Sequence, residues 1–164
     1  MEAVVTSIVV VVLLFTFLFR VVNVNGQSME DTIHNEDKVL LTNLFYEPEN
    51  GDVVVISRAQ HFEEPIIKRV IATEGQTLKI DFNTGDVYVD GVLLDEPYIK
   101  TPTTDNEGGE IPEVIPEGYV LVMGNNRGNS LDSRSEQIGL IDKRNIIGKA
   151  QYIVFPFDRI GGIG

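Results

Sequence analysis

The sequence predicts a mainly β protein: coiled antiparallel sheets that form a barrel-like domain, with one N-terminal transmembrane helix. Three observations predict this class. Short β-branched runs alternate with turn signals, no stretch of ten or more residues after Arg20 has helical periodicity, and one long apolar run opens the chain. Without that run, the 164-residue chain is long enough for one domain with a core, and too short for two.

The opening apolar run extends from Ala3 to Phe19 and contains only three polar residues, all serine or threonine. As a helix it would span roughly 25 Å, slightly less than a hydrocarbon core of ~30 Å. We expect residues 1–22 to anchor the chain in membrane lipid, with Arg20 at the interface. A cleavable signal peptide is the alternative, but no basic segment precedes the run.

Nine apolar runs with the composition of strands follow the anchor. They cover residues 21–24, 39–41, 53–56, 66–71, 78–82, 87–89, 92–94, 119–123 and 151–155. Asp90-Gly91 between two of these runs is a two-residue hairpin signal. We expect one β-rich domain over residues 23–160, and a frayed end at residues 161–164.

Residues 101–118 differ from the rest of the domain, because they hold three prolines, three glycines and five acidic residues. This composition predicts an acidic surface loop. The whole chain is acidic as well, with a formal net charge of −12. Phosphate backbones would repel such a chain, so nucleic acid is excluded as a partner.

Few residue types remain for chemistry. The chain has no cysteine, which excludes a disulfide scaffold, a cysteine nucleophile and a cysteine-based zinc site. His34 and His61 each lie among acidic residues in turn-like surroundings, and neither has metal-ligand spacing or a nucleophile motif beside it. We therefore expect no metal and no cofactor.

A serine and a lysine are left as candidates. Ser28 follows Gly26-Gln27 at the end of an expected strand, and Lys68 lies inside the apolar run 66–71. Alternation along that strand places Lys68 on the same face as aliphatic side chains. Taken alone, an edge-strand lysine pointing to water and an ordinary turn serine are the more common arrangements.

Four segments, in order, resemble the conserved boxes of the type I signal peptidases (leader peptidases), which are Ser/Lys serine proteases. They are the nucleophile box Gly26–Ile33, the strand box Asn50–Val55, the general-base box Lys68–Gln76 and the last box Met123–Arg134. Two positions depart from the family pattern. Asp31 stands where the family usually has proline, and Asn125 stands where it usually has aspartate.

The resemblance implies a catalytic pair, with Ser28 as nucleophile and Lys68 as general base. It also implies that the Ser130 hydroxyl hydrogen-bonds the Lys68 amine, that Asp132 and Arg134 form a supporting ion pair, and that Arg69 makes a structural contact. The Ser28 backbone N–H, in the Gly26 region, would bind the oxyanion. Some relatives add a side-chain hydroxyl two residues before the nucleophile, but in this sequence that position is Gly26.

A lysine can take the serine proton only as a neutral amine, so its pKa must fall by roughly three units from ~10.4. Burial among aliphatic side chains would lower the pKa in this way. The resemblance further implies a substrate, the signal peptide of a secreted preprotein with small residues at −1 and −3. We expect Val24, Met29 and Ile67 to line the shallow apolar pockets, and the substrate to add as a strand beside Val21–Gln27.

The family's topology places the chain in the cell membrane as a single-pass protein, with the catalytic domain on the extracytoplasmic side. Arg20 alone would weakly favour the opposite orientation. We expect a monomer. Two alternatives remain. A self-cleaving repressor-type protease would need a DNA-binding domain. A non-catalytic relative that assists assembly of pili or other surface structures would lack Ser28 or Lys68.

Overall fold

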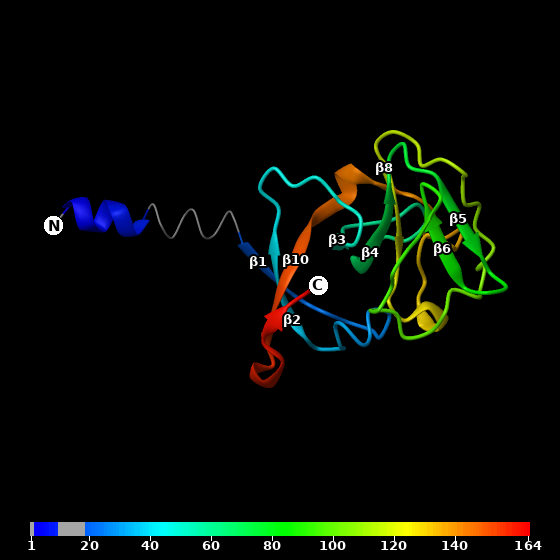
Figure 1. Ribbon diagram of the computed structural model, residues 1–164. Coiled ribbons are helices and arrows are strands. Elements are labelled where there is room, and N and C mark those ends of the chain that lie inside the picture. The colour runs from blue at the N-terminus through cyan, green and yellow to red at the C-terminus, as the bar shows by residue number, and fades with distance from the viewer. Residues whose placement is uncertain (1, 10–18) are drawn as a thin grey trace.

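The computed structural model describes residues 2–9 and 19–164, and residues 2–9 are helical (Figure 1). Most of the expected membrane span, residues 10–18, lies outside the described residues. Within the two described ranges, no helix has both the length and the apolar character needed to cross a membrane.

The described domain consists of eleven β-strands and three short 3-10 helices. The strands are β1 (Phe19–Asn23), β2 (Lys38–Thr42), β3 (Val53–Ile56), β4 (Ile66–Thr73), β5 (Leu78–Asp81), β6 (Asp86–Val89), β7 (Val92–Leu93), β8 (Tyr119–Met123), β9 (Ile141–Asp142), β10 (Ile146–Phe155) and β11 (Gly161–Gly162). The 3-10 helices are η1 (Arg127–Asn129), η2 (Lys143–Asn145) and η3 (Phe157–Arg159).

The main sheet is antiparallel and has the order β1-β2-β10-β3-β4-β8-β9, with β11 paired to β10. The long strand β10 joins the two halves, because it pairs with β2 along one part and with β3 along another. Irregular register in both pairings allows β10 to bend, and the sheet curls around its core (Figure 1).

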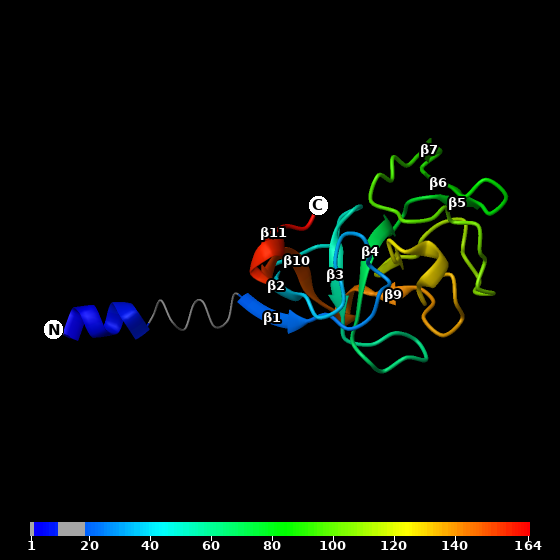
Figure 2. The same ribbon diagram turned by 90° about the horizontal axis from the view of Figure 1, so that it is seen from below.

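A second sheet of β5, β6 and β7 stands beside the main one (Figure 2). The predicted hairpin at Asp90-Gly91 is confirmed, because Val89 pairs with Val92 across it. Both turn residues have positive φ, 51° for Asp90 and 77° for Gly91, as a tight two-residue hairpin requires.

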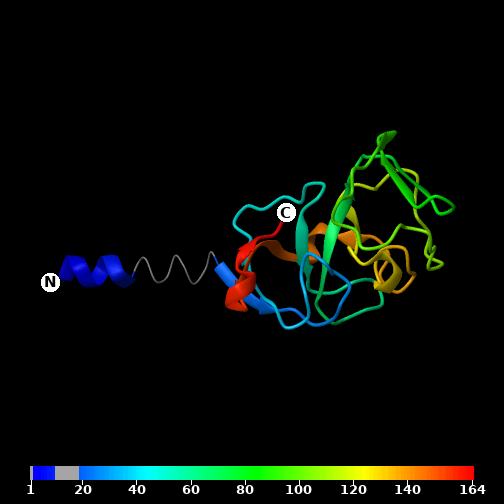
Figure 3. The same ribbon diagram turned by 60° about the horizontal axis from the view of Figure 1, so that its bottom comes forward.

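Strand β4 separates two apolar clusters and places its polar residues on opposite faces. Ile67 belongs to the cluster that contains Val24, Met29 and Val39, whereas Val70 packs with residues of β3 and β8 on the other face. Lys68 shares the face of Val70, as predicted from alternation. Figure 3 shows β3 and β4 side by side at the centre of the domain.

Each of the nine expected strand runs coincides with a strand, although the first half of β10 and the short strands β9 and β11 were not expected. Residues 161–162 pair with β10, so the expected fraying of this segment is wrong. The sheet begins at Phe19, three residues before the expected end of the anchor. The loop 101–118 lies mainly on the surface, although Thr103 and Ile115 are buried.

Candidate active site

The segment between β1 and β2 carries Ser28 at a turn. Glu30 N–H donates to the Gln27 carbonyl at 3.3 Å, and Thr32 and Ile33 both donate to the Met29 carbonyl at 2.9 Å. Gly26 has a φ of 102°, which a side-chain-bearing residue rarely adopts, so glycine permits the chain to enter this turn. The half-buried Ser28 hydroxyl is thereby presented to β4.

The structure brings the two expected catalytic side chains together. Lys68 Nζ lies 2.7 Å from Ser28 Oγ and 3.1 Å from the Ile67 carbonyl oxygen. Lys68 comes from the middle of β4 and is only 4% exposed, so it is not an edge-strand lysine that points to water. A base must lie within about 2.6–3.2 Å of the proton carrier, and this contact satisfies that requirement.

Burial lowers the pKa of Lys68 from 10.5 to about 8, opposed by the negative charges of Asp132 and Glu107. Desolvation penalises the ammonium form, because a buried charge loses its hydration. A shift of this size corresponds to about 3 kcal/mol against the charged form. At neutral pH a useful fraction of Lys68 is therefore neutral and can accept a proton.

Asp132 and Arg134 form the predicted ion pair, and both side chains are fully buried. Arg134 Nε lies 2.9 Å from Asp132 Oδ1. The predicted bond between the Ser130 hydroxyl and Lys68 is not present among the described residues; Ser130 Oγ donates instead to Asp132 Oδ2 at 2.8 Å. A carboxylate two residues away is the stronger acceptor, so it takes the hydroxyl proton.

Gly124 lies where the first and last boxes meet. Its N–H donates to Asp132 Oδ2 at 2.9 Å. A Cβ at this position would overlap Ser130 Oγ and would lie 2.5 Å from the Ser28 carbonyl oxygen. Close approach of the two backbones therefore requires glycine here.

Arg69 makes the predicted structural contact. Its Nε donates to Asn125 Oδ1 at 3.0 Å, and the Asn125 amide donates to Thr32 Oγ1 at 2.6 Å. Its guanidinium also stacks on the Tyr98 ring at 4.0 Å from the ring centre. Asn125, one of the two departures from the family pattern, thus links the base strand to the nucleophile segment as a hydrogen-bonding amide.

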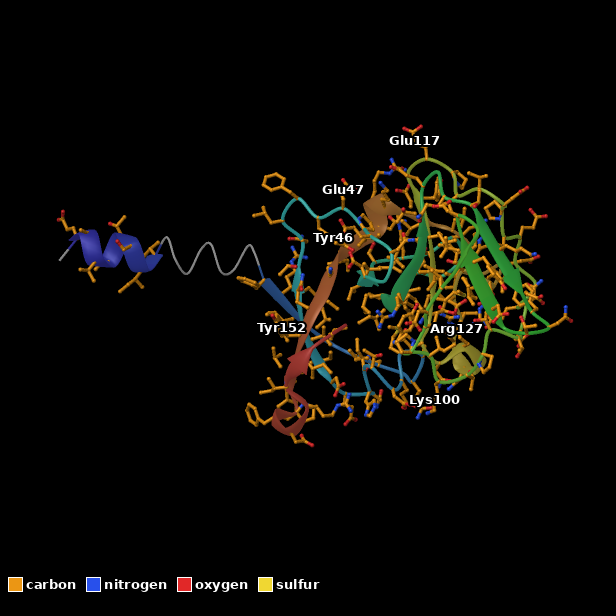
Figure 4. The ribbon with its side chains drawn as sticks, viewed as in Figure 1. Tyr46, Glu47, Lys100, Glu117, Arg127 and Tyr152 are labelled. Carbon is orange, nitrogen blue, oxygen red and sulfur yellow. The ribbon has the colours of Figure 1, made fainter. Side chains whose placement is uncertain are left out.

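The beginning of the acidic loop packs on the last box, while most of the loop is exposed to solvent. Arg127, labelled in Figure 4, donates to Thr103 Oγ1 and to the Glu96 carboxylate, and its Nε donates to the Gly124 carbonyl at 2.9 Å. Lys100, also labelled there, binds the Glu30 carboxylate at 3.0 Å. Residues 96–103 therefore connect the last box, through Arg127, with the segment that carries Ser28, through Lys100.

Val24, Met29 and Ile67 lie together in one apolar cluster, and each is at most 9% exposed. Their assignment to substrate pockets stays a prediction, because the structure contains no ligand. Sequence reasoning gave no role to Asn126, whose backbone N–H donates to the Ser28 carbonyl at 2.9 Å. The position of Asn126 inside the last box could have indicated such a contact.

No group of three histidine, aspartate or glutamate side chains in residues 2–9 and 19–164 lies close enough to bind a metal ion. What the geometry does provide is a serine hydroxyl and a desolvated amine in direct contact, on a curled β-sheet. This combination is typical of serine peptidases of the Ser/Lys class.

Comparisons with known proteins agree with that class. The sequence profile of the family described as signal peptidase, peptidase S26, matches residues 1–155. Signal peptidase I of Bacillus licheniformis is 31% identical over 172 residues, covering 97% of this chain and 89% of that protein. Signal peptidase I P of Bacillus subtilis subsp. natto is 32% identical over 170 residues, covering 97% and 89%.

The chain therefore belongs to the signal peptidase family, peptidase S26, and is a serine endopeptidase. A solved structure agrees at the level of the fold. It is a signal peptidase I from Enterococcus faecalis V583, with a TM-score of 0.51 and 24% identity, covering 63% of this chain and 97% of that chain.

Proposed function

We propose that this peptidase removes N-terminal signal peptides from secreted preproteins, with Ser28 as nucleophile and Lys68 as general base. The observation that carries the proposal is the 2.7 Å contact between Lys68 Nζ and Ser28 Oγ, made by a lysine that is almost wholly buried. The relatives that match nearly the whole chain are named as peptidases, so no observation favours the non-catalytic alternative.

In the first half of the reaction, neutral Lys68 accepts the Ser28 hydroxyl proton while Ser28 Oγ attacks the carbonyl carbon of the scissile bond. The tetrahedral intermediate collapses, Lys68 passes the proton to the leaving amine, and the mature protein departs with its new N-terminus. The signal peptide remains as an ester on Ser28. Lys68 then takes a proton from water, which attacks the ester, and returns that proton to Ser28 Oγ as the signal peptide is released.

The developing oxyanion needs a donor beside Ser28. Within the described residues the Ser28 backbone N–H donates to no other group, so it is available for this role. Gly26 keeps the preceding turn without a side chain, and no atom would lie within 4 Å of a Cβ there. The space beside the turn can therefore admit the substrate backbone.

The substrate binds as an added strand. Among the described strands β1 pairs with β2 alone, so from Val21 onward its outer edge is open to an added strand that leads to Ser28. Val24, Met29 and Ile67 form the floor that the −1 and −3 side chains approach. Because these three are packed into the core, only shallow space remains above them, which favours small residues.

The N-terminal segment that precedes β1, residues 1–18, anchors the enzyme in the cell membrane as a single-pass protein, with the domain on the extracytoplasmic side. The apolar run Ala3–Phe19 and the helix at residues 2–9 support this. Flotation of the full chain with lipid vesicles tests it. Lysines in place of Ile8 and Val9 should release the protein from the vesicles, and unchanged flotation would contradict the anchor.

Cleavage of a purified preprotein by the full chain in detergent micelles tests the substrate assignment. We expect one cut after an alanine at −1, identified by N-terminal sequencing of the product. The same preprotein with phenylalanine at −1 should be cut at least about a hundredfold more slowly, because a shallow pocket rejects the ring. Equal cleavage of both substrates, or none of either, would overturn the proposal.

A further inference from the structure

The C-terminal turn lies beside the far end of the segment that carries Ser28. Phe155 at the end of β10 pairs with Lys38 at the start of β2, and the two strands are antiparallel. Residues just after β10 therefore lie next to residues just before β2. Figure 1 shows η3 at this end of β10, beside the start of β2.

Arg159, the last residue of η3, reaches into that segment. One guanidinium nitrogen lies 3.0 Å from Asp37 Oδ2 and 3.5 Å from the Thr32 carbonyl oxygen. The other terminal nitrogen lies 2.7 Å from His34 Nδ1. One side chain from the C-terminal turn thus contacts three residues that follow the nucleophile.

Asp37 connects this contact to the backbone of the segment. It is 1% exposed, and its Oδ2 accepts the His34 N–H at 2.8 Å. Its own carbonyl accepts the N–H of Val24, on the chain just before Ser28, at 2.8 Å. The Arg159–Asp37 pair therefore lies at the base of the Ser28 loop, where the chain enters and leaves it.

The Arg159 side chain is 26% exposed, which is less than its neighbours Phe157 and Ile160 in the same turn. Phe157 and Ile160 beside it are 79% and 58% exposed, whereas the Arg159 Nε atom is buried and has no hydrogen-bond partner in the described part of the chain. An unsatisfied buried N–H is unfavourable. The contacts of Arg159 with the Ser28 loop must offset the cost of this unsatisfied N–H, so these contacts hold the side chain in place.

We propose that Arg159 is a positioning residue for Ser28, an inference that rests on the proposed peptidase function. The loop is held at its nucleophile end by the Asn126–Ser28 hydrogen bond and at its base by Arg159 on Asp37. With both ends fixed, Ser28 Oγ stays within reach of Lys68. Arg159 touches neither catalytic side chain and acts through the orientation of the loop.

The test compares cleavage of a preprotein by the full chain and its Arg159→Gln, Arg159→Lys and Arg144→Gln variants. Arg144 is the matched control, since it also pairs with an aspartate but is 88% exposed and far from the loop in sequence. We expect Arg159→Gln to lower kcat about tenfold with KM within about twofold, because a misoriented nucleophile impairs the chemical step. Arg159→Lys should recover part of kcat, and Arg144→Gln should match the wild type.

Hydrogen exchange on the same proteins gives a readout that does not depend on catalysis. The His34 amide should exchange at least about tenfold faster in Arg159→Gln, because its acceptor Asp37 loses its partner, while β3 and β4 stay protected. Unchanged kcat and unchanged exchange in Arg159→Gln, with a wild type that cleaves preprotein, would overturn this inference alone. A wild type that fails to cleave would overturn the proposed function, and the exchange result would still decide the role of Arg159 in the loop.

A double substitution separates positioning from general destabilisation. If Arg159 acts through Asp37, the variant carrying both Arg159→Gln and Asp37→Asn should lose no more kcat than the more impaired single variant. The positioning role would be contradicted if the kcat losses of the two single variants multiply in the double variant and follow a decrease in its melting temperature.

Discussion

Asn126 donates its backbone N–H to the Ser28 carbonyl oxygen at 2.9 Å, so the last sequence box directly holds the backbone of the first at Ser28. The two residues are almost one hundred positions apart, and the curled sheet brings them together around Lys68. Ser28 is therefore positioned by a backbone contact as well as by its side-chain hydrogen bond with Lys68. The predictions below test separate parts of this arrangement.

The pH dependence of cleavage follows from the lowered pKa of Lys68, about 8. Because the neutral amine is the active form, kcat/KM should rise about tenfold per pH unit well below 8 and level off above it. Initial rates measured between pH 5 and 10 check this. A profile that is flat through pH 8, or that falls there, would contradict Lys68 as the base.

Glu107 opposes the lowering of the Lys68 pKa, so its removal should move the profile. Glu107→Gln removes a negative charge that favours the ammonium, and the rising limb should shift to lower pH. Glu110→Gln, in the same loop, is the control and should leave the limb in place. An unshifted limb in Glu107→Gln would show that this charge does not act on Lys68.

Gly124→Ala should reduce kcat by about a hundredfold, because the added Cβ displaces Ser130 and the Ser28 backbone from their positions. Gly128→Ala is the matched control in the same box, since the nearest atom to its Cβ would be 3.4 Å away. Steady-state kinetics and melting temperatures distinguish the two variants. Wild-type kcat in Gly124→Ala would refute the close-approach argument.

Asn125→Ala should destabilise the fold by about 1–3 kcal/mol, because the buried Arg69 loses an acceptor and Thr32 loses a donor. Asn125→Asp restores the residue usual in the family and should keep stability near wild type, since the carboxylate accepts from both partners. Denaturant unfolding measures the difference, with exposed Asn83→Ala as control. Equal stability of all these variants would contradict the bridging role.

The strands could be predicted from local patterns, and the Ser28–Lys68 contact from the resemblance of four segments to the signal peptidase boxes. Alternation in the run 66–71 places Lys68 with aliphatic side chains, and the boxes identify Ser28 beside it. The Ser130 contact could not be predicted in detail. Ser130 Oγ donates to the buried Asp132 carboxylate, whose position depends on how the last box packs.

Contacts that depend on strand register left no local pattern. Arg159 meets Asp37 only because Phe155 pairs with Lys38, and a shift of this register would separate them. Thr103 is buried and accepts a hydrogen bond from Arg127. Sequence reasoning assigned no role to Arg127, so this burial could not be predicted either. In the acidic loop, composition indicated polarity correctly but not the inward-facing residues.

Cleavage of a preprotein by Ser28→Ala and Lys68→Ala tests the central claim most directly. Ser57→Ala and the exposed Lys79→Ala serve as matched controls, because neither residue lies in the site. With melting temperatures near wild type, we expect both site variants to lose at least about a thousandfold in kcat/KM, and both controls to cleave normally. Normal cleavage by either folded site variant would contradict the Ser28–Lys68 mechanism.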